Sequence, residues 1–188
     1  WLGAGFLAMD RGLAALVSTT LPILLASGLE VGKITLGIAL AGMFLSLAIF
    51  AAPLGILADR IGGAKVRLIS AILCGVSLAG LGLMAWLPPV VVLPPSLLVY
   101  GVGAAGLMPS AFSIAVRPEA SNLVFGSLQA SGQAGYAIGV LVGGLIVSVV
   151  ALPAEILLST MFPIAGFIFI VLNILLLVVI VRMPKSVR

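Results

Sequence analysis

The chain has 188 residues, of which 63% are hydrophobic and 7% charged, and its nine basic and five acidic residues give a formal net charge of +4. A soluble domain carries about 25% charged residues, so this composition predicts an integral membrane protein with no room for a soluble domain. The absence of histidine and the single cysteine, Cys74, remove the usual residues of haem, metal and general-base sites. We therefore expect no enzyme, no cofactor and no metal site.

The apolar stretches are long enough to cross a bilayer, which takes about 20 helical residues. Backbone polar groups must be paired within lipid, and the stretches lack the alternation of barrel strands, so we expect helices. The predicted fold class is an all-α membrane protein, a single domain over residues 1–188. Its six spans are expected at residues 2–27, 34–58, 66–87, 96–116, 123–150 and 156–181.

The first predicted span carries Asp10 and Arg11 in its first half and Pro22 in its second half. At 1.5 Å per residue this helix is longer than the hydrocarbon core is thick, which leaves two alternatives. If the membrane begins near residue 8, both charges are interfacial; if it begins near residue 2, both lie inside. In the second case Asp10 is the one obvious proton carrier and a candidate for the substrate path.

The connection between the second and third spans concentrates charge in an otherwise apolar sequence. We expect a short solvated loop at one membrane face, in which Lys65 and Arg67 anchor the chain on the cytoplasmic side. The next connection has no charge. Pro88-Pro89 and Pro94-Pro95 mark its two ends, because proline ends a helix. It is expected at the opposite face.

Basic residues are retained on the cytoplasmic side of a membrane protein. Lys33 is the one basic residue expected on the far side, with Arg11 left aside. The side of the central connection holds Arg60, Lys65, Arg67, Arg117, Arg182, Lys185 and Arg188. This bias predicts that both termini are cytoplasmic, and we expect the location to be a bacterial inner (plasma) membrane.

The fifth span carries a stripe of small residues on one side of the helix, which lets another helix pack closely. Helix packing is favoured over a direct gating role for this stripe, which consists of Gly132, Gly135, Gly139 and Gly143.

A polar face lies beside the glycine stripe. Polar side chains within a span are costly unless they face water or the bundle interior, so this face is a candidate for the substrate path. Hydrogen bonding between helices is the alternative. The face is formed by Gln129, Gln133 and Tyr136, and Asn173 in the sixth span is a weaker candidate of the same kind.

The central connection has the spacing Gly-x-x-x-Asp-Arg-x-Gly followed by two basic residues, at Gly55, Asp59, Arg60, Gly62, Lys65 and Arg67. This pattern resembles the signature loop between helices two and three of the major facilitator superfamily of secondary transporters. The family's two basic residues directly after the second glycine are here Gly63 and Ala64, which is a departure from the pattern.

Two further stretches are similar to glycine-rich motifs of the same family. Residues 135–144 resemble a motif in helix five of its drug antiporters, with Val140 in the place of a proline. Residues 101–105 resemble helix four, but Leu97 stands where the family often has an arginine. The first departure weakens an antiporter interpretation, and the second counts against a proton-coupled exporter.

The resemblance implies one six-helix half, N-terminal-like and built as 3+3 inverted repeats, of a transporter that has two such halves around its solute site. The second half would come from the same chain, a split partner or a homodimer. Two functions remain open. The first is a secondary active transporter, or half of one, that moves a small solute by alternating access with the central connection as a gating loop. The alternative is a non-transporting membrane subunit that serves as a scaffold or assembly factor in a larger complex. Neither function requires nucleic acid.

Overall fold

The computed structural model describes residues 2–27, 29, 31–115, 122–149 and 153–182, which form six long helices and one short 3-10 helix. The helices are α1 (Leu2–Ser27), α2 (Lys33–Ile61), α3 (Gly63–Leu81), α4 (Pro89–Ala115), α5 (Asn122–Val149) and α6 (Ala154–Arg182), and the 3-10 helix η1 (Gly82–Ala85) follows α3. The described residues contain no β-strand. All six long helices have the length and composition to cross a membrane, so the predicted all-α membrane fold is confirmed.

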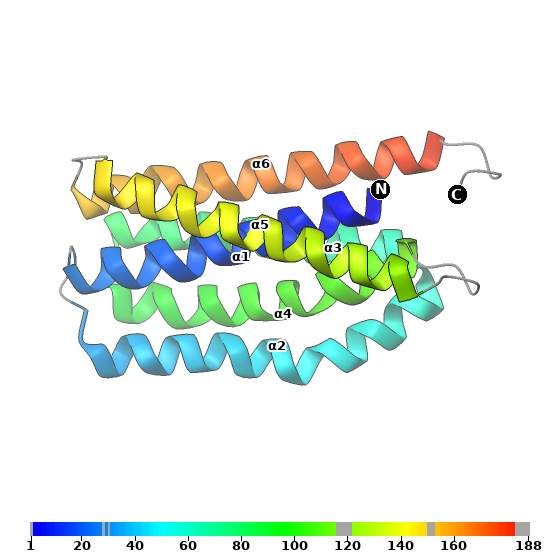
Figure 1. Cartoon of the computed structure of the whole chain (residues 1–188). Coiled ribbons are helices and arrows are strands. Elements are labelled where there is room, and N and C mark those ends of the chain that lie inside the picture. The colour runs from blue at the N-terminus through cyan, green and yellow to red at the C-terminus, as the bar shows by residue number, and fades with distance from the viewer. Residues whose placement is uncertain (1, 28, 30, 116–121, 150–152, 183–188) are drawn as a thin grey trace.

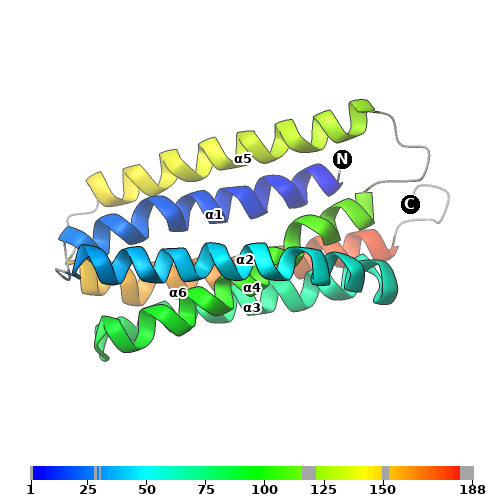
Figure 2. The same cartoon turned by 90° about the horizontal axis from the view of Figure 1, so that it is seen from below.

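The six helices run along one common direction (Figure 1). The beginning of α1, the junction of α2 with α3 and the end of α6 lie at the same end of the bundle. Helix α1 packs along α5, α4 packs along α2, and α3 packs against α6 (Figure 2). If α1, α2 and α3 are matched with α4, α5 and α6, the α1–α5 pair corresponds to the α4–α2 pair. Each helix runs in the opposite direction to its counterpart. This arrangement is that of 3+3 inverted repeats.

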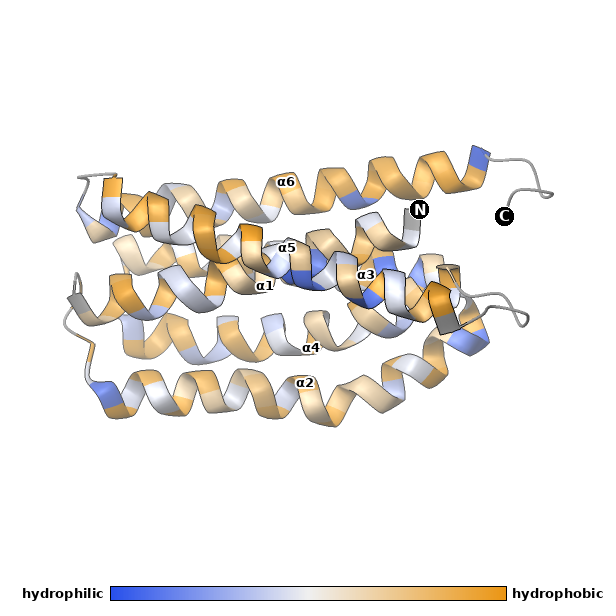
Figure 3. Cartoon of the chain, viewed as in Figure 1, coloured by the Kyte–Doolittle hydropathy of each residue, from blue (hydrophilic) through white to orange (hydrophobic). Residues whose placement is uncertain are grey.

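Hydrophobic residues dominate all six helices (Figure 3), and many large apolar side chains are exposed on the outside of the bundle. Ile34 and Leu123 are 80% and 83% exposed, as expected of side chains that face lipid. The interior differs from the outside by its buried polar side chains, which are Thr20, Ser46, Arg67, Ser70, Ser77, Ser110 and Asn173. A functional site is therefore expected among these buried polar groups.

The junction of α2 with α3 is tighter than the expected loop. Helix α2 continues to Ile61 and α3 begins at Gly63, so Gly62 alone separates them. Its φ of 96° lies in the region that glycine enters without a steric penalty. The Gly62 N–H donates to the carbonyl oxygen of Ala58 at 3.0 Å, and the Gly62 carbonyl accepts from the N–H of Lys65 at 3.2 Å. The charged residues of this region therefore lie on helices.

The expected connection before α4 is also shorter. Helix α4 begins at Pro89 and contains Pro94 and Pro95, which were expected to precede it. Proline fits the first position of a helix because that position needs no N–H donor. Pro94 and Pro95 lie within the first turns, where membrane helices tolerate proline because neighbouring groups satisfy the freed carbonyls.

Candidate functional site

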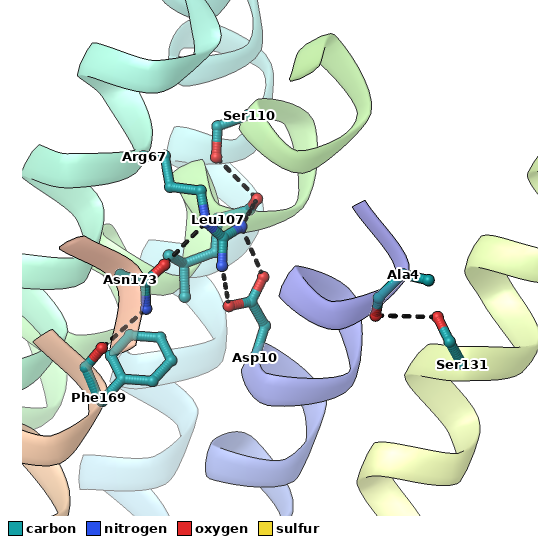
Figure 4. Close-up of polar contacts among 8 residues, drawn as sticks. All are labelled: Ala4, Asp10, Arg67, Leu107, Ser110, Ser131, Phe169 and Asn173. Atoms are coloured by element: carbon teal, nitrogen blue, oxygen red, sulfur yellow. Dashed lines mark hydrogen bonds and ion pairs between the residues drawn. The ribbon is translucent and has the colours of Figure 1, made fainter. Parts of the chain in front are cut away.

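Arg67 and Asp10 form a buried ion pair inside the bundle (Figure 4). The Arg67 side chain is 0% exposed and that of Asp10 is 10% exposed. Arg67 Nη1 donates to Asp10 Oδ2 at 3.0 Å, and Arg67 Nη2 donates to Asp10 Oδ1 at 2.5 Å. This two-pronged geometry is the strongest form of an arginine–carboxylate contact. It joins the second turn of α3 to the first half of α1.

Two further helices, α6 and α4, provide acceptors for the Arg67 guanidinium. Nε donates to Asn173 Oδ1 of α6 at 2.8 Å, and Nη1 also donates to the carbonyl oxygen of Leu107 in α4 at 3.1 Å. The ring of Phe6 lies 3.8 Å from Arg67 Cζ, within the range of a cation–π contact. No buried side-chain nitrogen or oxygen of the described residues lacks a partner. We call Asp10, Arg67 and Asn173 the Arg67 cluster.

Small residues bring α3 and α4 close enough to form this cluster. A Cβ at Gly63 would lie 3.0 Å from the carbonyl oxygen of Ser110 and from the Ser113 side chain. A Cβ at Gly106 would clash with the Ser70 hydroxyl. The beginning of α3 can therefore rest directly on α4, which places Arg67, one turn further along α3, beside the Leu107 carbonyl.

The structure brings together Asp10 and Asn173, which the sequence marked as candidates for the substrate path, through Arg67, which it did not. The expectation that Arg67 is a solvated cytoplasmic anchor is wrong, because this side chain is fully buried. The physical reason is that α3 begins at Gly63 rather than at Val66, so position 67 is already inside the bundle. The opposite charges of Asp10 and Arg67 within two apolar spans were the signal that could have revealed the pair.

The other charged residues of the predicted gating loop lie outside the cluster. Asp59, Arg60 and Lys65 are exposed, and none of them forms an ion pair within the described parts of the chain. Gly55 faces α4, where a Cβ would lie 3.6 Å from Pro109 Cβ. The gating role of these residues stays a prediction. Arg117, Lys185 and Arg188 lie outside the described residues.

Four of the six glycines of α5, which are Gly132, Gly135, Gly139 and Gly143, face α1. All four are buried, and a Cβ at Gly135 or Gly139 would clash with the backbone carbonyl of Ala8 or Gly12 in α1. The Ser131 hydroxyl also donates to the carbonyl oxygen of Ala4 at 3.1 Å (Figure 4). The backbones of α1 and α5 are thus in direct contact along the side that carries Gly132, Gly135, Gly139 and Gly143.

The polar face of α5 does not join the Arg67 cluster. Gln129, Gln133 and Tyr136 are exposed on α5, next to the side that packs on α1. One turn before Gln129, the ring of Phe125 stacks on Phe112 of α4 with centroids 5.9 Å apart. Gln129 and Tyr136 share the side of Phe125 at helical spacing, so they point toward the α4 side of α5.

An apolar groove of about 460 Å³ lies between α1, α5 and α6. Its lining side chains include Met9 and Leu13 of α1 and Ile138 of α5, and none of the residues along it is polar. It offers no group that would orient a polar solute. Among the described residues no cluster of histidine, cysteine or acidic side chains could hold a metal ion.

Comparison with known proteins agrees with the six-helix architecture. The sequence profile of the Major Facilitator Superfamily matches residues 1–188. A search of curated proteins finds no match. The profile spans all six helices and includes the Gly62 junction and the Arg67 cluster. The earlier resemblance is therefore confirmed, and the chain belongs to the Major Facilitator Superfamily.

Proposed function

We propose that the chain is a secondary active transporter, or one half of one, that moves a small solute by alternating access. Membership in the family implies a transporter-type function, since members of this family are transporters rather than enzymes. In alternating access, two halves rock around a solute site at their interface. The six helices supply one half, and the second half comes from another copy, a partner chain or a further segment of the same chain.

The observation that carries this proposal is the Arg67 cluster. Ionised side chains are rare inside membrane helices because removing them from water is costly, and where they occur they are commonly functional. A structural scaffold could fill the same space with apolar side chains at no loss of stability. The cluster ties α1, α3, α4 and α6 into one rigid unit and holds the Asp10 carboxylate in a fixed orientation.

We further propose that the α2–α3 junction faces the cytoplasm of a bacterial inner membrane. Exposed Arg60, Lys65 and Arg182 lie at that end of the bundle, and Lys33 lies at the other end. This distribution supports cytoplasmic termini even without Arg67, which does not count as a loop residue. The exposed carboxylate of Asp59 is then free to contact the second half in one of the two transport states.

Reconstitution into liposomes tests the proposal. The purified chain is assayed for uptake of radiolabelled solutes from a chemically diverse panel under an imposed gradient. Asp59→Asn is expected to reduce the uptake rate strongly while leaving thermal stability unchanged. Glu155→Gln is the matched control, because Glu155 is an exposed acid at the opposite end of the bundle. Equal uptake by the two variants would contradict the gating role of Asp59.

The mass of the intact particle separates transport from the scaffold alternative. Native mass spectrometry from mild detergent is expected to give two six-helix halves in one particle, as alternating access requires. A single six-helix copy bound to unrelated subunits, together with no uptake above empty liposomes, would contradict the transporter and favour the scaffold.

A further inference from the structure

Three charged side chains lie in the spans away from the helix ends of the described residues: Asp10, Arg11 and Arg67. Two are positive and one is negative, so one positive charge is left over. The pairing decides which residue carries it. Both carboxylate oxygens of Asp10 accept hydrogen bonds from Arg67. The uncompensated charge therefore belongs to Arg11.

The two arginines differ in how their donors are satisfied. Each of the three guanidinium nitrogens of Arg67 donates to an oxygen. Arg11 has a single hydrogen bond within the described part of the chain, from Nη2 to Met108 Sδ at 3.9 Å. A thioether sulfur is a weak acceptor and carries no charge. Arg11 thus presents several strong donors and a positive charge, and it forms no ion pair within the described residues.

Arg11 lies on the face of α1 that looks toward α4 and α5. Its guanidinium reaches Met108 of α4, and its Cγ would lie 3.3 Å from a Cβ at Gly132 of α5. Gly132 therefore leaves room for the stem of Arg11 to lie across α5. Met9 and Leu13, which line the apolar groove, lie on the opposite side of α1.

The polar face of α5 flanks this position. Gln129 and Gln133 lie three residues before and one residue after Gly132, and Tyr136 follows one turn later. All three side chains are exposed and can donate hydrogen bonds. A half-buried arginine bordered by amide and hydroxyl donors is a set of groups that fits oxygen atoms carrying negative charge.

We propose that the solute is an anion and that Arg11 binds its carboxylate or phosphate group, with Gln129, Gln133 and Tyr136 as neighbouring donors. This inference rests on the proposed transport function and names its substrate class. The phosphate of an anionic lipid headgroup has the same chemistry. The solute is favoured because Arg11 lies within α1, between α4 and α5, and not at a helix end where headgroups lie.

Thermal unfolding of the full chain in an uncharged detergent tests the proposal. The probes are sodium phosphate, sodium citrate and sodium acetate, compared with tetramethylammonium chloride and glucose at constant ionic strength. At least one anion is expected to raise Tm by about 3 °C or more, and the cation and the sugar are not. Arg11→Gln should abolish the shift, Arg11→Lys should keep part of it, and Lys33→Gln should keep all of it.

Three outcomes of this experiment would overturn the proposal. They are no shift with any of the anions, the same shift in Arg11→Gln, and a shift with added phosphatidylglycerol but not with the soluble anions. The last outcome would assign Arg11 to lipid headgroups. Uptake of a neutral or cationic solute would also refute the anion inference while leaving the transporter function intact. Arg11-dependent anion binding without any uptake would support the anion inference and contradict the transporter function.

A second measurement keeps the proposal testable if Arg11→Gln does not fold. Two variants that retain Arg11 are made, Gln133→Cys and Ile138→Cys. Each is reacted with an anionic and with a cationic methanethiosulfonate reagent. Ile138 is the matched control, because it is 60% exposed on α5 but lines the apolar groove. The ratio of anionic to cationic rates is expected to be about threefold higher at position 133. Equal ratios at the two positions would overturn the proposal.

Discussion

Arg67 of α3 holds both carboxylate oxygens of Asp10 in α1, although the two residues are 57 positions apart in the sequence. The pair lies inside an apolar bundle, where each charge depends on the other for its stability. Its contribution to the fold is therefore asymmetric. Removing one partner leaves a buried charge, whereas removing both does not.

This asymmetry predicts a strong coupling between substitutions at the two positions. Arg67→Met alone is expected to destabilise the chain by about 3–5 kcal/mol, because Asp10 is left buried without its partner. Arg67→Met combined with Asp10→Asn should recover much of that loss. Chemical unfolding in detergent, analysed as a double-mutant cycle, measures the coupling. If the effects of the single substitutions simply add, the pair is not energetically linked.

Asn173 is expected to act through Arg67. Asn173→Ala removes the acceptor of Arg67 Nε and should destabilise the chain by about 1–3 kcal/mol, the penalty of an unsatisfied buried donor. Ser159→Ala is the control on the same helix, because the Ser159 hydroxyl donates within its own helix, to the carbonyl oxygen of Ile156. The free energies of unfolding of the two variants give the comparison. A loss no larger than that of Ser159→Ala would show that Arg67 does not need the amide.

The contact between α1 and α5 predicts different effects of alanine at two glycines of α5. Gly139→Ala would push a Cβ into the Gly12 carbonyl and is expected to cost about 1–3 kcal/mol. A Cβ at Gly144 meets nothing within 4 Å, so Gly144→Ala should be neutral or slightly stabilising through helix propensity. Melting temperatures in detergent distinguish the two. Similar melting temperatures would argue against close contact of the helix backbones.

The positive φ of Gly62 predicts a specific sensitivity at the α2–α3 junction. Gly62→Ala forces an alanine to a φ of 96° and is expected to destabilise the chain by about 1–3 kcal/mol. Gly37→Ala in α2 is the control, because a Cβ there also meets no neighbour. Because space is open at both positions, a difference between the variants reports the backbone strain at Gly62 together with the helix propensity that alanine gains at Gly37. Equal stability would indicate that the junction does not require glycine.

The number of helices and the family could be predicted from local information. Span lengths follow from apolar runs, and the family follows from the spacing of Gly55, Asp59 and Gly62. The site could be predicted only in part, because it depends on where a helix begins. A start at Gly63 instead of Val66 turns Arg67 from an exposed anchor into a buried partner of Asp10.

Periodicity groups residues on a face but does not say which helix that face meets. It placed Gln129, Gln133 and Tyr136 together on α5, and the structure keeps them together. It did not connect them with Arg11, because that relation depends on Gly132 packing beside the Arg11 side chain. Contacts between helices far apart in the sequence are the information that a single sequence lacks.

Because Gly62 alone joins α2 to α3, the two helices are expected to move together. Asp59 and Arg60 lie in the last turn of α2, and Arg67 lies in the second turn of α3. The Gly62 N–H and carbonyl are bonded to the two helices it joins, so the junction has little freedom to absorb a displacement. We therefore expect a displacement of Asp59 to be passed on to the base of α3. The same displacement would reach the Arg67–Asp10 ion pair one turn further along α3.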